Sequence, residues 1–359
     1  MKIDIIGAGP AGSYVGYLLA QDGHDVDIYE EHPSIGIPFQ CTGILTSELD
    51  KFVKITEDFY VNTIEKARIQ VNDAFVDIDM HRPNTIIERT KFDQHVAELA
   101  KKAGARVHLQ HRFIENNGKE LTIKDVKNDR MIKKKTDILI GADGPNSTVA
   151  KCNGMYGDRK FWIGIQARAE YPNQNVVEML PKVGTFGWIV PEDDKIVRIG
   201  LVGDKHTKQD FDQLLKERGI TKILGHQGGL IPKYDPSVVT EKGHVYLIGD
   251  AALQVKATTA GGIVQALIAG QALRDSIKYG KSYEKEWRKR LGRDLWLHKY
   301  MRDVLDKFKD ADYEYIINLF NRPKIRRYLE AFDREYPSKF MLQLFFSEPR
   351  LLKFIKYLF

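Results

Sequence analysis

The sequence predicts an α/β fold in which a domain built on a parallel sheet carries an inserted antiparallel β-sheet and is followed by a C-terminal helical segment. Three observations predict this architecture. Residues 2–32, KIDIIGAGPAGSYVGYLLAQDGHDVDIYEEH, read as strand, glycine-rich turn, helix and second strand. Residues 155–235 contain short runs of β-branched and aromatic residues bounded by Pro, Asn and Asp. From residue 281 onward the chain becomes helical and amphipathic.

The glycines of the first turn have the spacing of a Rossmann-type dinucleotide site. Gly7, Gly9 and Gly12 form GxGxxG, with Ala11 among them: Gly7 permits the tight turn, Gly9 admits a pyrophosphate, and Gly12 lets helix and strand pack closely. The following helix offers free N–H groups and a positive dipole end to phosphates. Glu30, 18 residues after Gly12, can accept hydrogen bonds from ribose hydroxyls. The motif predicts a dinucleotide without separating FAD from NAD.

Composition narrows the class of protein. A chain of 359 residues with 43% hydrophobic and 29% charged residues fits a globular protein of roughly two or three domains. Cys41 and Cys152 form neither a CxxC pair nor a disulfide framework, which favours a reducing cytoplasm. We expect no secretory signal, no membrane-spanning helix and no metal site, because no segment has the apolar length or the ligand spacing.

Two later segments favour FAD as the cofactor. In TDILIGADGPNSTVAK, residues 136–151, an apolar strand leads to Asp143. In residues 244–273 another strand leads to Gly249 and Asp250, and a turn with Gly261, Gly262 and Ile263 opens a long apolar helix. An aspartate after a strand can hold a ribityl hydroxyl, and glycine N–H groups can approach the flavin. Together with the first motif, these segments resemble the para-hydroxybenzoate hydroxylase-like FAD flavoproteins.

This resemblance implies two further cofactor contacts and a division into domains. Arg89 would contact the flavin nucleotide near its pyrophosphate or ribityl chain, and backbone groups at Phe113 would lie near the adenine. We expect residues 1–154 and 236–280 to form a discontinuous FAD-binding domain. Residues 155–235 would be the β-sheet substrate domain, which covers the flavin in this superfamily, and residues 281–359 the C-terminal helical segment.

The stretch FGWIVP carries a narrower resemblance. Phe186, Trp188 and Val190 alternate, so they share one face of a strand. With PFQCTG, residues 38–43, and GDAALQVKATTAGGI, residues 249–263, this stretch resembles the geranylgeranyl reductase family. Departures from the family pattern are Phe186 for tyrosine, Val190 for an aromatic residue, Ala257 for proline and Ala260 for glycine. The first two bear on the shape of the lipid tunnel, the last two on the flavin loop.

The narrower resemblance places Cys41 and Thr42 beside the flavin and makes Cys41, Phe186 and Trp188 the candidate catalytic residues. A covalent nucleophile is unsupported, because no base or second thiol is evident near Cys41. We prefer packing and polarity tuning as its role. Protonation of a substrate carbon is the alternative.

The function implied is an FAD-dependent reductase that saturates isoprenoid carbon–carbon double bonds of archaeal-type membrane lipids by hydride transfer from reduced flavin. The electron donor, NAD(P)H or ferredoxin, is left open, since no second GxGxxG appears. The alternatives are an FAD-dependent hydroxylase (monooxygenase) of aromatic or polyene substrates, a non-enzymatic flavin-bound lipid-binding protein and a plain NAD dehydrogenase.

Charge is concentrated at the C-terminus. Residues 281–359 hold 19 Lys and Arg against 12 Asp and Glu, whereas the other 280 residues hold 36 against 37. The last ten residues, RLLKFIKYLF, space Arg350, Lys353 and Lys356 three apart among apolar residues. A basic amphipathic helix can lie on the inner face of the cell membrane, dock on the protein's own core or guard a tunnel mouth. No nucleic-acid-binding pattern is present.

Overall fold

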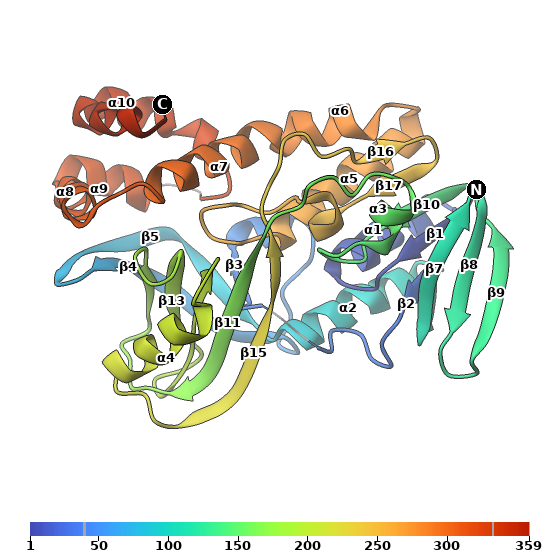
Figure 1. The fold of residues 1–359 in the computed structure, drawn as a ribbon, viewed down its shortest axis with the longest axis horizontal. Coiled ribbons are helices and arrows are strands. Elements are labelled where there is room, and N and C mark those ends of the chain that lie inside the picture. The colour runs from blue at the N-terminus through green and yellow to red at the C-terminus, as the bar shows by residue number, and fades with distance from the viewer. Residues whose placement is uncertain (39–40, 332–333, 359) are drawn as a thin grey trace.

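The computed structural model describes residues 1–38, 41–331 and 334–358. The predicted parallel sheet is present, with six strands in the order β16-β17-β10-β1-β2-β6 (Figure 1). Its strands are β1 (Lys2–Ile6), β2 (Asp25–Glu30), β6 (Arg106–Leu109), β10 (Ile138–Gly141), β16 (Glu241–Lys242) and β17 (Val245–Leu247). All of them pair in parallel except β16 with β17. The carboxyl ends of β1, β2 and β10 therefore meet at one edge of the sheet.

Helices cover one face of this sheet. They are α1 (Pro10–Gln21), α2 (Arg89–Lys102) and α5 (Ile263–Tyr279). Ile5 of β1, Val15 of α1, Ala97 of α2 and Ala269 of α5 are buried in a single apolar cluster. The apolar spacing that predicted the first and third helices thus reflects contact with the sheet and with one another.

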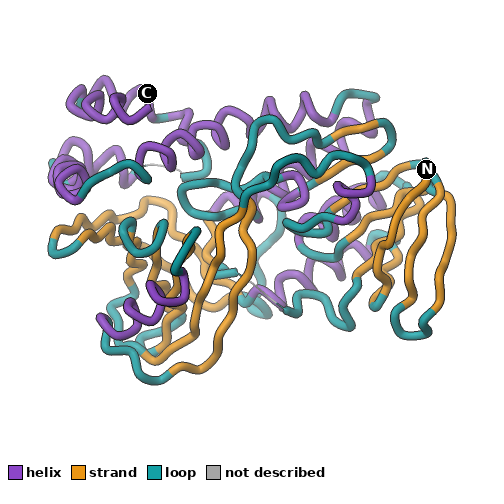
Figure 2. Tube along the Cα trace, in the orientation of Figure 1, coloured by secondary structure: helices purple, strands orange, loops and turns teal. Residues whose placement is uncertain are grey.

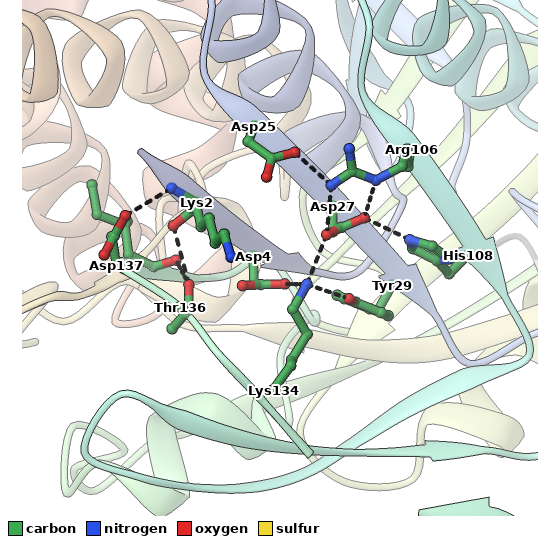
Figure 3. Close-up of polar contacts among 11 residues, drawn as sticks. Lys2, Asp4, Asp25, Asp27, Tyr29, Arg106, His108, Lys134, Thr136 and Asp137 are labelled. Carbon is green, nitrogen blue, oxygen red and sulfur yellow. Dashed lines mark hydrogen bonds and ion pairs between the residues drawn. The ribbon is translucent and has the colours of Figure 1, made fainter. Parts of the chain in front are cut away.

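A three-stranded sheet covers the opposite face. It consists of β7 (His111–Asn117), β8 (Glu120–Asp125) and β9 (Arg130–Lys135). Figure 3 shows the polar contacts that join the sheets: Lys134 Nζ lies 2.7 Å from Asp4 Oδ1 and 2.7 Å from Asp27 Oδ2. Burial opposes the charge of Asp27, but His108, Arg106 and Lys134 outweigh it and hold the pKa of this carboxyl far below its usual range.

The second large sheet has eight strands in the order β15-β11-β14-β13-β12-β4-β5-β3. They are β3 (Ile44–Thr46), β4 (Tyr60–Val71), β5 (Ala74–Ile87), β11 (Phe161–Glu170), β12 (Val176–Leu180), β13 (Phe186–Pro191), β14 (Ile196–Gly203) and β15 (Ile223–Pro232). A hairpin at residues 191–195 joins β13 to β14. Among the described strands of this second sheet, only β12 and β4 pair in parallel.

The assignment of this sheet to residues 155–235 is incomplete, because β3, β4 and β5 come from residues 44–87. Helix α4 (Thr207–Glu217) packs beside β11 and β14 and buries Phe211 and Leu214 in a cluster with Ile199. The domain boundaries themselves stay a prediction.

The C-terminal part is helical, as expected, and forms a layer along one side of both sheets (Figure 2). Its helices are α6 (Tyr283–Trp287), α7 (Arg293–Leu305), α8 (Asp310–Phe320), α9 (Pro323–Glu330), α10 (Met341–Ser347) and a final 3₁₀ segment, Pro349–Leu358. A π-helical turn, Arg288–Gly292, links α6 to α7. Tyr313 and Ile317 of α8 pack on Val71 and Val76 of the β4–β5 hairpin.

The last segment docks partly on the protein itself. Leu351 and Phe354 are buried against α8 and α9, so they do not belong to an exposed apolar face. Leu352 and Ile355 are exposed. The side chains of residues 358 and 359, which the sequence placed on the same apolar side, lie outside the described residues. Within the described part of the chain, no helix is long and apolar enough to cross a bilayer.

Candidate active site

The glycine turn lies at the carboxyl edge of the parallel sheet. Gly7 has φ +100°, a value that disfavours a side chain, and its N–H donates to the carbonyl of Tyr29 at 2.8 Å. A Cβ on Gly12 would stand 2.0 Å from the Gly7 carbonyl oxygen, so only glycine fits. A Cβ on Gly9 would meet no atom of the described residues within 4 Å. The turn is therefore tight where helix meets strand and open where a phosphate would approach.

Glu30 is held at the end of β2 beside this turn. Its Oε2 accepts a hydrogen bond from the N–H of Ala8 at 2.9 Å, and its Oε1 accepts one from the N–H of His32 at 3.0 Å. His32 Nδ1 lies 2.6 Å from the same Oε1. A carboxylate has about four acceptor positions, so capacity for a ribose hydroxyl remains.

Asp143 follows β10 and lies next to the glycine turn. A Cβ on Gly7 would stand 3.2 Å from Asp143 Cα. Asp143 Oδ2 accepts from the N–H of Val149 at 3.0 Å, whereas its buried Oδ1 has no partner among the described residues. Burial raises the pKa of this carboxyl. An acceptor left unpaired in the interior is costly, so its presence here indicates a ligand with a donor group.

Arg89 brings separate segments together. It opens α2, whose N-terminus is capped by Glu88, and pairs with Asp93 through Nε–Oδ1 at 2.7 Å and Nη2–Oδ2 at 3.1 Å. Burial opposes its charge, but Asp93 and the neighbouring Cys41 outweigh this and raise the pKa of Arg89. Burial also raises the pKa of Asp250, with the charge of Arg89 acting against it. Residues near positions 41, 89 and 250 thus share one buried region.

The second glycine loop closes over the same region. Gly249 has φ +66°, and a Cβ there would stand 2.9 Å from the Cβ of Ala11. A Cβ on Gly262 would stand 3.2 Å from Asp250 Oδ1. Ile263 begins α5 and belongs to an apolar cluster against which Cys41 packs. The N-cap of α5 is Gly262, which has no side chain, so the first N–H groups of the helix have no side-chain cap.

A buried ion pair, Lys256 with Glu335, packs against this loop. A Cβ on Gly261 would stand 2.9 Å from Cε of Lys256. Lys256 Nζ lies 2.6 Å from both Oε1 and Oε2 of Glu335, and both side chains are buried. The C-terminal segment therefore contacts the loop that the sequence assigned to the flavin.

The eight-stranded sheet supplies the remaining wall. Thr42 Oγ1 and Trp188 Nε1 each donate to Oε1 of Gln166 at 2.7 Å, so Gln166 joins the Cys41–Thr42 segment to β13. The Thr42 carbonyl accepts from Arg198 Nη1 at 2.6 Å. Phe186 and Trp188 lie with ring centroids 5.9 Å apart. Both rings contact a cluster that contains Ala257 and, at its edge, Ala260 of the glycine loop, so sheet and loop face each other.

Sequence reasoning missed Gln166, Arg198, Lys256 and Glu335. The signal was present for Arg198, a charged residue inside the otherwise apolar strand β14, and for Gln166, an amide that follows the apolar run of residues 161–165. Phe113 does not belong to the residues grouped above. It lies on β7, where its side chain is buried beneath the three-stranded sheet with Tyr29 and its backbone pairs with Ile123. A role for Phe113 near the adenine stays a prediction, as do the roles of the other site residues.

The residues present fit FAD. The turn is open at Gly9, Asp143 with its unpaired Oδ1 lies next to Gly7, and Glu30 stands at the end of the next strand. When bound, FAD supplies hydride chemistry that no side chain can perform.

Comparison with known proteins supports this cofactor. Residues 1–200 match the model of the FAD binding domain family. Digeranylgeranylglycerophospholipid reductase of Methanosarcina acetivorans is 30% identical, with 86% of this chain and 85% of that protein covered. The reductase of the same name from Methanocaldococcus jannaschii is 28% identical, with 98% and 96% covered.

Solved structures show the same fold. A geranylgeranyl bacteriochlorophyll reductase-like protein of Thermoplasma acidophilum matches with a TM-score of 0.84 at 19% identity, covering 100% of this chain and 99% of that one. A flavin-dependent halogenase matches with a TM-score of 0.71 at 16% identity, covering 98% and 78%. The chain belongs to the FAD binding domain family and, within it, to the family of digeranylgeranylglycerophospholipid reductases.

Proposed function

We propose that this flavoenzyme saturates the carbon–carbon double bonds of geranylgeranyl chains carried by an archaeal-type glycerophospholipid. The observation that carries the proposal is the apolar wall of Phe186 and Trp188, which faces the glycine loop across from Cys41 and Thr42. The curated relatives that span the chain are named for the same lipid. A hydrocarbon chain needs such a wall, because it offers no charged or polar group to bind.

The reaction requires the protein mainly to position the lipid chain against the cofactor and to exclude water. When bound and reduced, FAD would supply the hydride for one alkene carbon, and a proton would have to add to the other. Phe186 and Trp188 would align the chain and exclude water. An unpolarised alkene develops no oxyanion, so a catalytic triad or metal centre has no task here.

Cys41 borders this space and packs on the cluster that contains Ile263. Its Sγ accepts a hydrogen bond from the N–H of Gly43 at 3.3 Å. We assign to it packing and polarity tuning beside the cofactor. Proton donation to the substrate carbon is the alternative, and the two roles predict different variant kinetics.

Product mass separates this function from its rivals. The purified enzyme is supplied with digeranylgeranylglycerophospholipid and either NAD(P)H or reduced ferredoxin, and the lipid is weighed by mass spectrometry. A reductase adds a pair of hydrogens for each bond saturated. Addition of an oxygen atom would instead identify a hydroxylase. An unchanged lipid would favour a non-enzymatic lipid-binding protein. Comparing the two donors also identifies the electron source.

We further propose that the protein contacts the membrane through a C-terminal surface. Four apolar side chains there are exposed: Leu342 by 59%, Phe346 by 84%, Leu352 by 47% and Ile355 by 39%. Arg350, Lys353 and Lys356 lie in the same stretch of chain. Apolar side chains beside cations suit an anionic lipid surface. Such contact gives the enzyme access to a substrate that resides in the bilayer.

A further inference from the structure

The amide of Gln166 has a fixed orientation. Its Oε1 lies 2.7 Å from Trp188 Nε1 and 2.7 Å from Thr42 Oγ1. An indole nitrogen can only donate, so the Gln166 atom that faces it must be the carbonyl oxygen. The NH₂ group is therefore directed away from both partners.

This NH₂ group is buried and unused. Gln166 is only 4% exposed, and its Nε2 has no hydrogen-bond partner among the described residues. Two neighbouring side chains also have a buried polar atom without a hydrogen-bond partner among the described residues. One is Oε1 of Gln227, which pairs with Gln166 between β15 and β11. The other is Nε1 of Trp162, four positions before Gln166 on the same face of β11. Unpaired buried donors and acceptors are costly, so a ligand is expected to satisfy them.

The sheet holds the Gln166 amide against Trp188 and places strand β11 beside the glycine loop. Gly200 lies between Gln166 and Trp188 in the pairing of β11, β14 and β13. A Cβ there would stand 2.7 Å from Cζ2 of Trp188, so the indole lies across the glycine to reach Gln166. Trp162 lies in the same cluster as Ala257 of the loop. The Gln166 amide thus lies between Thr42 and Trp188, on the face of β11 whose Trp162 contacts the loop.

Of the two ligands of this site, only one can use a hydrogen bond in this position. An isoprenoid chain has no acceptor, whereas the pyrimidine part of the flavin ring presents carbonyl oxygens beside an N–H. We infer that Gln166 Nε2 donates to a carbonyl oxygen of the flavin ring, with Gln227 Oε1 available to the neighbouring N–H. Gln166 is then a flavin-binding residue as well as the residue that positions Thr42 and Trp188. The inference rests on FAD as cofactor and not on the identity of the lipid.

The test uses Gln166→Glu. This change keeps an acceptor for Thr42 and Trp188 and replaces only the NH₂ group. We expect the dissociation constant of FAD, from titration of the apoprotein, to rise about tenfold or more. We also expect the flavin reduction potential of the holoenzyme to become more negative, because a carboxylate beside the ring disfavours added electrons. Both are measured without lipid, so they stand even if the proposed substrate fails.

Gln70→Glu is the matched control, since Gln70 lies on β4 and donates to Asn72 in an exposed turn. It should leave both quantities unchanged. Unaltered FAD affinity and potential in Gln166→Glu, with tryptophan fluorescence like wild type, would overturn the inference. So would a change confined to the KM for lipid, which would assign the amide to the substrate. If Gln166→Glu does not fold, Gln227→Met carries the same test without a buried charge, with weaker FAD binding expected and unchanged binding contradicting the inference.

Discussion

At the scale of single residues, variants of Cys41 distinguish its two candidate roles, packing beside the cofactor and donation of a proton to the substrate. If the thiol only packs beside the cofactor, Cys41→Ala should retain turnover within a few-fold of wild type, because the removed group is small. If the thiol gives the proton, turnover should fall by about 10²–10⁴-fold, the usual contribution of a general acid. We expect the first result. Cys41→Ser and the exposed Cys152→Ser serve as comparison and control, and turnover with saturating lipid is the measurement.

What could be predicted at this scale depended on distance along the chain. Gly7, Gly12 and Glu30 lie within one strand–helix–strand unit, so local spacing was enough to place them. Gln166 contacts Thr42 across 124 positions and Arg198 contacts it across 156. No local pattern encodes such a pairing, because it depends on how the strands are ordered in the sheet.

At the scale of elements, the buried pair of Lys256 and Glu335 joins the C-terminal segment to the glycine loop. Gln265 Nε2 donates to Oε2 of Glu335 at 2.6 Å and Thr46 Oγ1 donates to Oε1 at 3.0 Å. Glu335→Gln removes the carboxylate that pairs with the buried Lys256 and should lower the free energy of unfolding by about 3–5 kcal/mol. Denaturant unfolding of the holoenzyme measures this loss.

Two further variants show whether the loss arises from the unpaired charge. Lys256→Met combined with Glu335→Gln should recover part of the lost stability, because the buried lysine charge is then removed together with its carboxylate. Asp212→Asn breaks the exposed pair with Lys208 and should behave like wild type. A double variant less stable than Glu335→Gln by the full cost of a second mutation would contradict the account.

The same cluster predicts how stability depends on pH. Burial, and then the charge of Lys256, lower the pKa of His298 to about 3, below its ordinary 6.5. The folded state therefore resists a proton that the unfolded chain accepts, and stability falls as pH drops below about 6.5, by up to about 1.4 kcal/mol per pH unit. Glu335 has its pKa lowered to about 2 because its pairing with Lys256 outweighs burial. Its contribution is lost only as pH falls from about 4.5 towards 2.

Unfolding curves between pH 7 and pH 5 exclude the contribution of Glu335, since that range lies above its window, and a variant of His298 then identifies the share of this histidine. His298→Asn can still bond Thr258, whose Oγ1 lies 2.7 Å from Nδ1 of the histidine. It should flatten the dependence on pH in this range. An unchanged slope would show that His298 is not the titrating group.

Element types were predicted better than their partners. The strands of residues 161–203 and the helices after residue 281 follow from local periodicity and are confirmed. The membership of β3, β4 and β5 in the second sheet was not predictable, because a strand's partner depends on the packing of the whole chain. For the same reason the final ten residues looked like one amphipathic face, although Leu351 and Phe354 are buried in the protein.

At the scale of the whole molecule, α8 and α9 lie against the β4–β5 hairpin (Figure 1), whereas α6 and α7 pack into the core of the parallel sheet. The four exposed apolar side chains of the proposed membrane surface lie on α10 and on the segment after it. Phe346→Glu should reduce binding to vesicles of anionic phospholipid, measured by co-sedimentation. Turnover of detergent-dispersed lipid should be retained, because the active site is untouched.

Leu224→Glu is the matched control, since Leu224 is an exposed apolar residue of β15. It should leave vesicle binding intact. Equal binding of wild type and Phe346→Glu would remove the C-terminal surface as the membrane contact.

The central claim is that reduced flavin in this protein gives its electrons to an isoprenoid double bond. The most direct measurement is anaerobic: the holoenzyme is reduced chemically, mixed with digeranylgeranylglycerophospholipid, and followed by flavin absorbance while the lipid is analysed by mass spectrometry. The account predicts that the flavin reoxidises as the lipid gains hydrogen pairs. A flavin that stays reduced beside an unchanged lipid would contradict it.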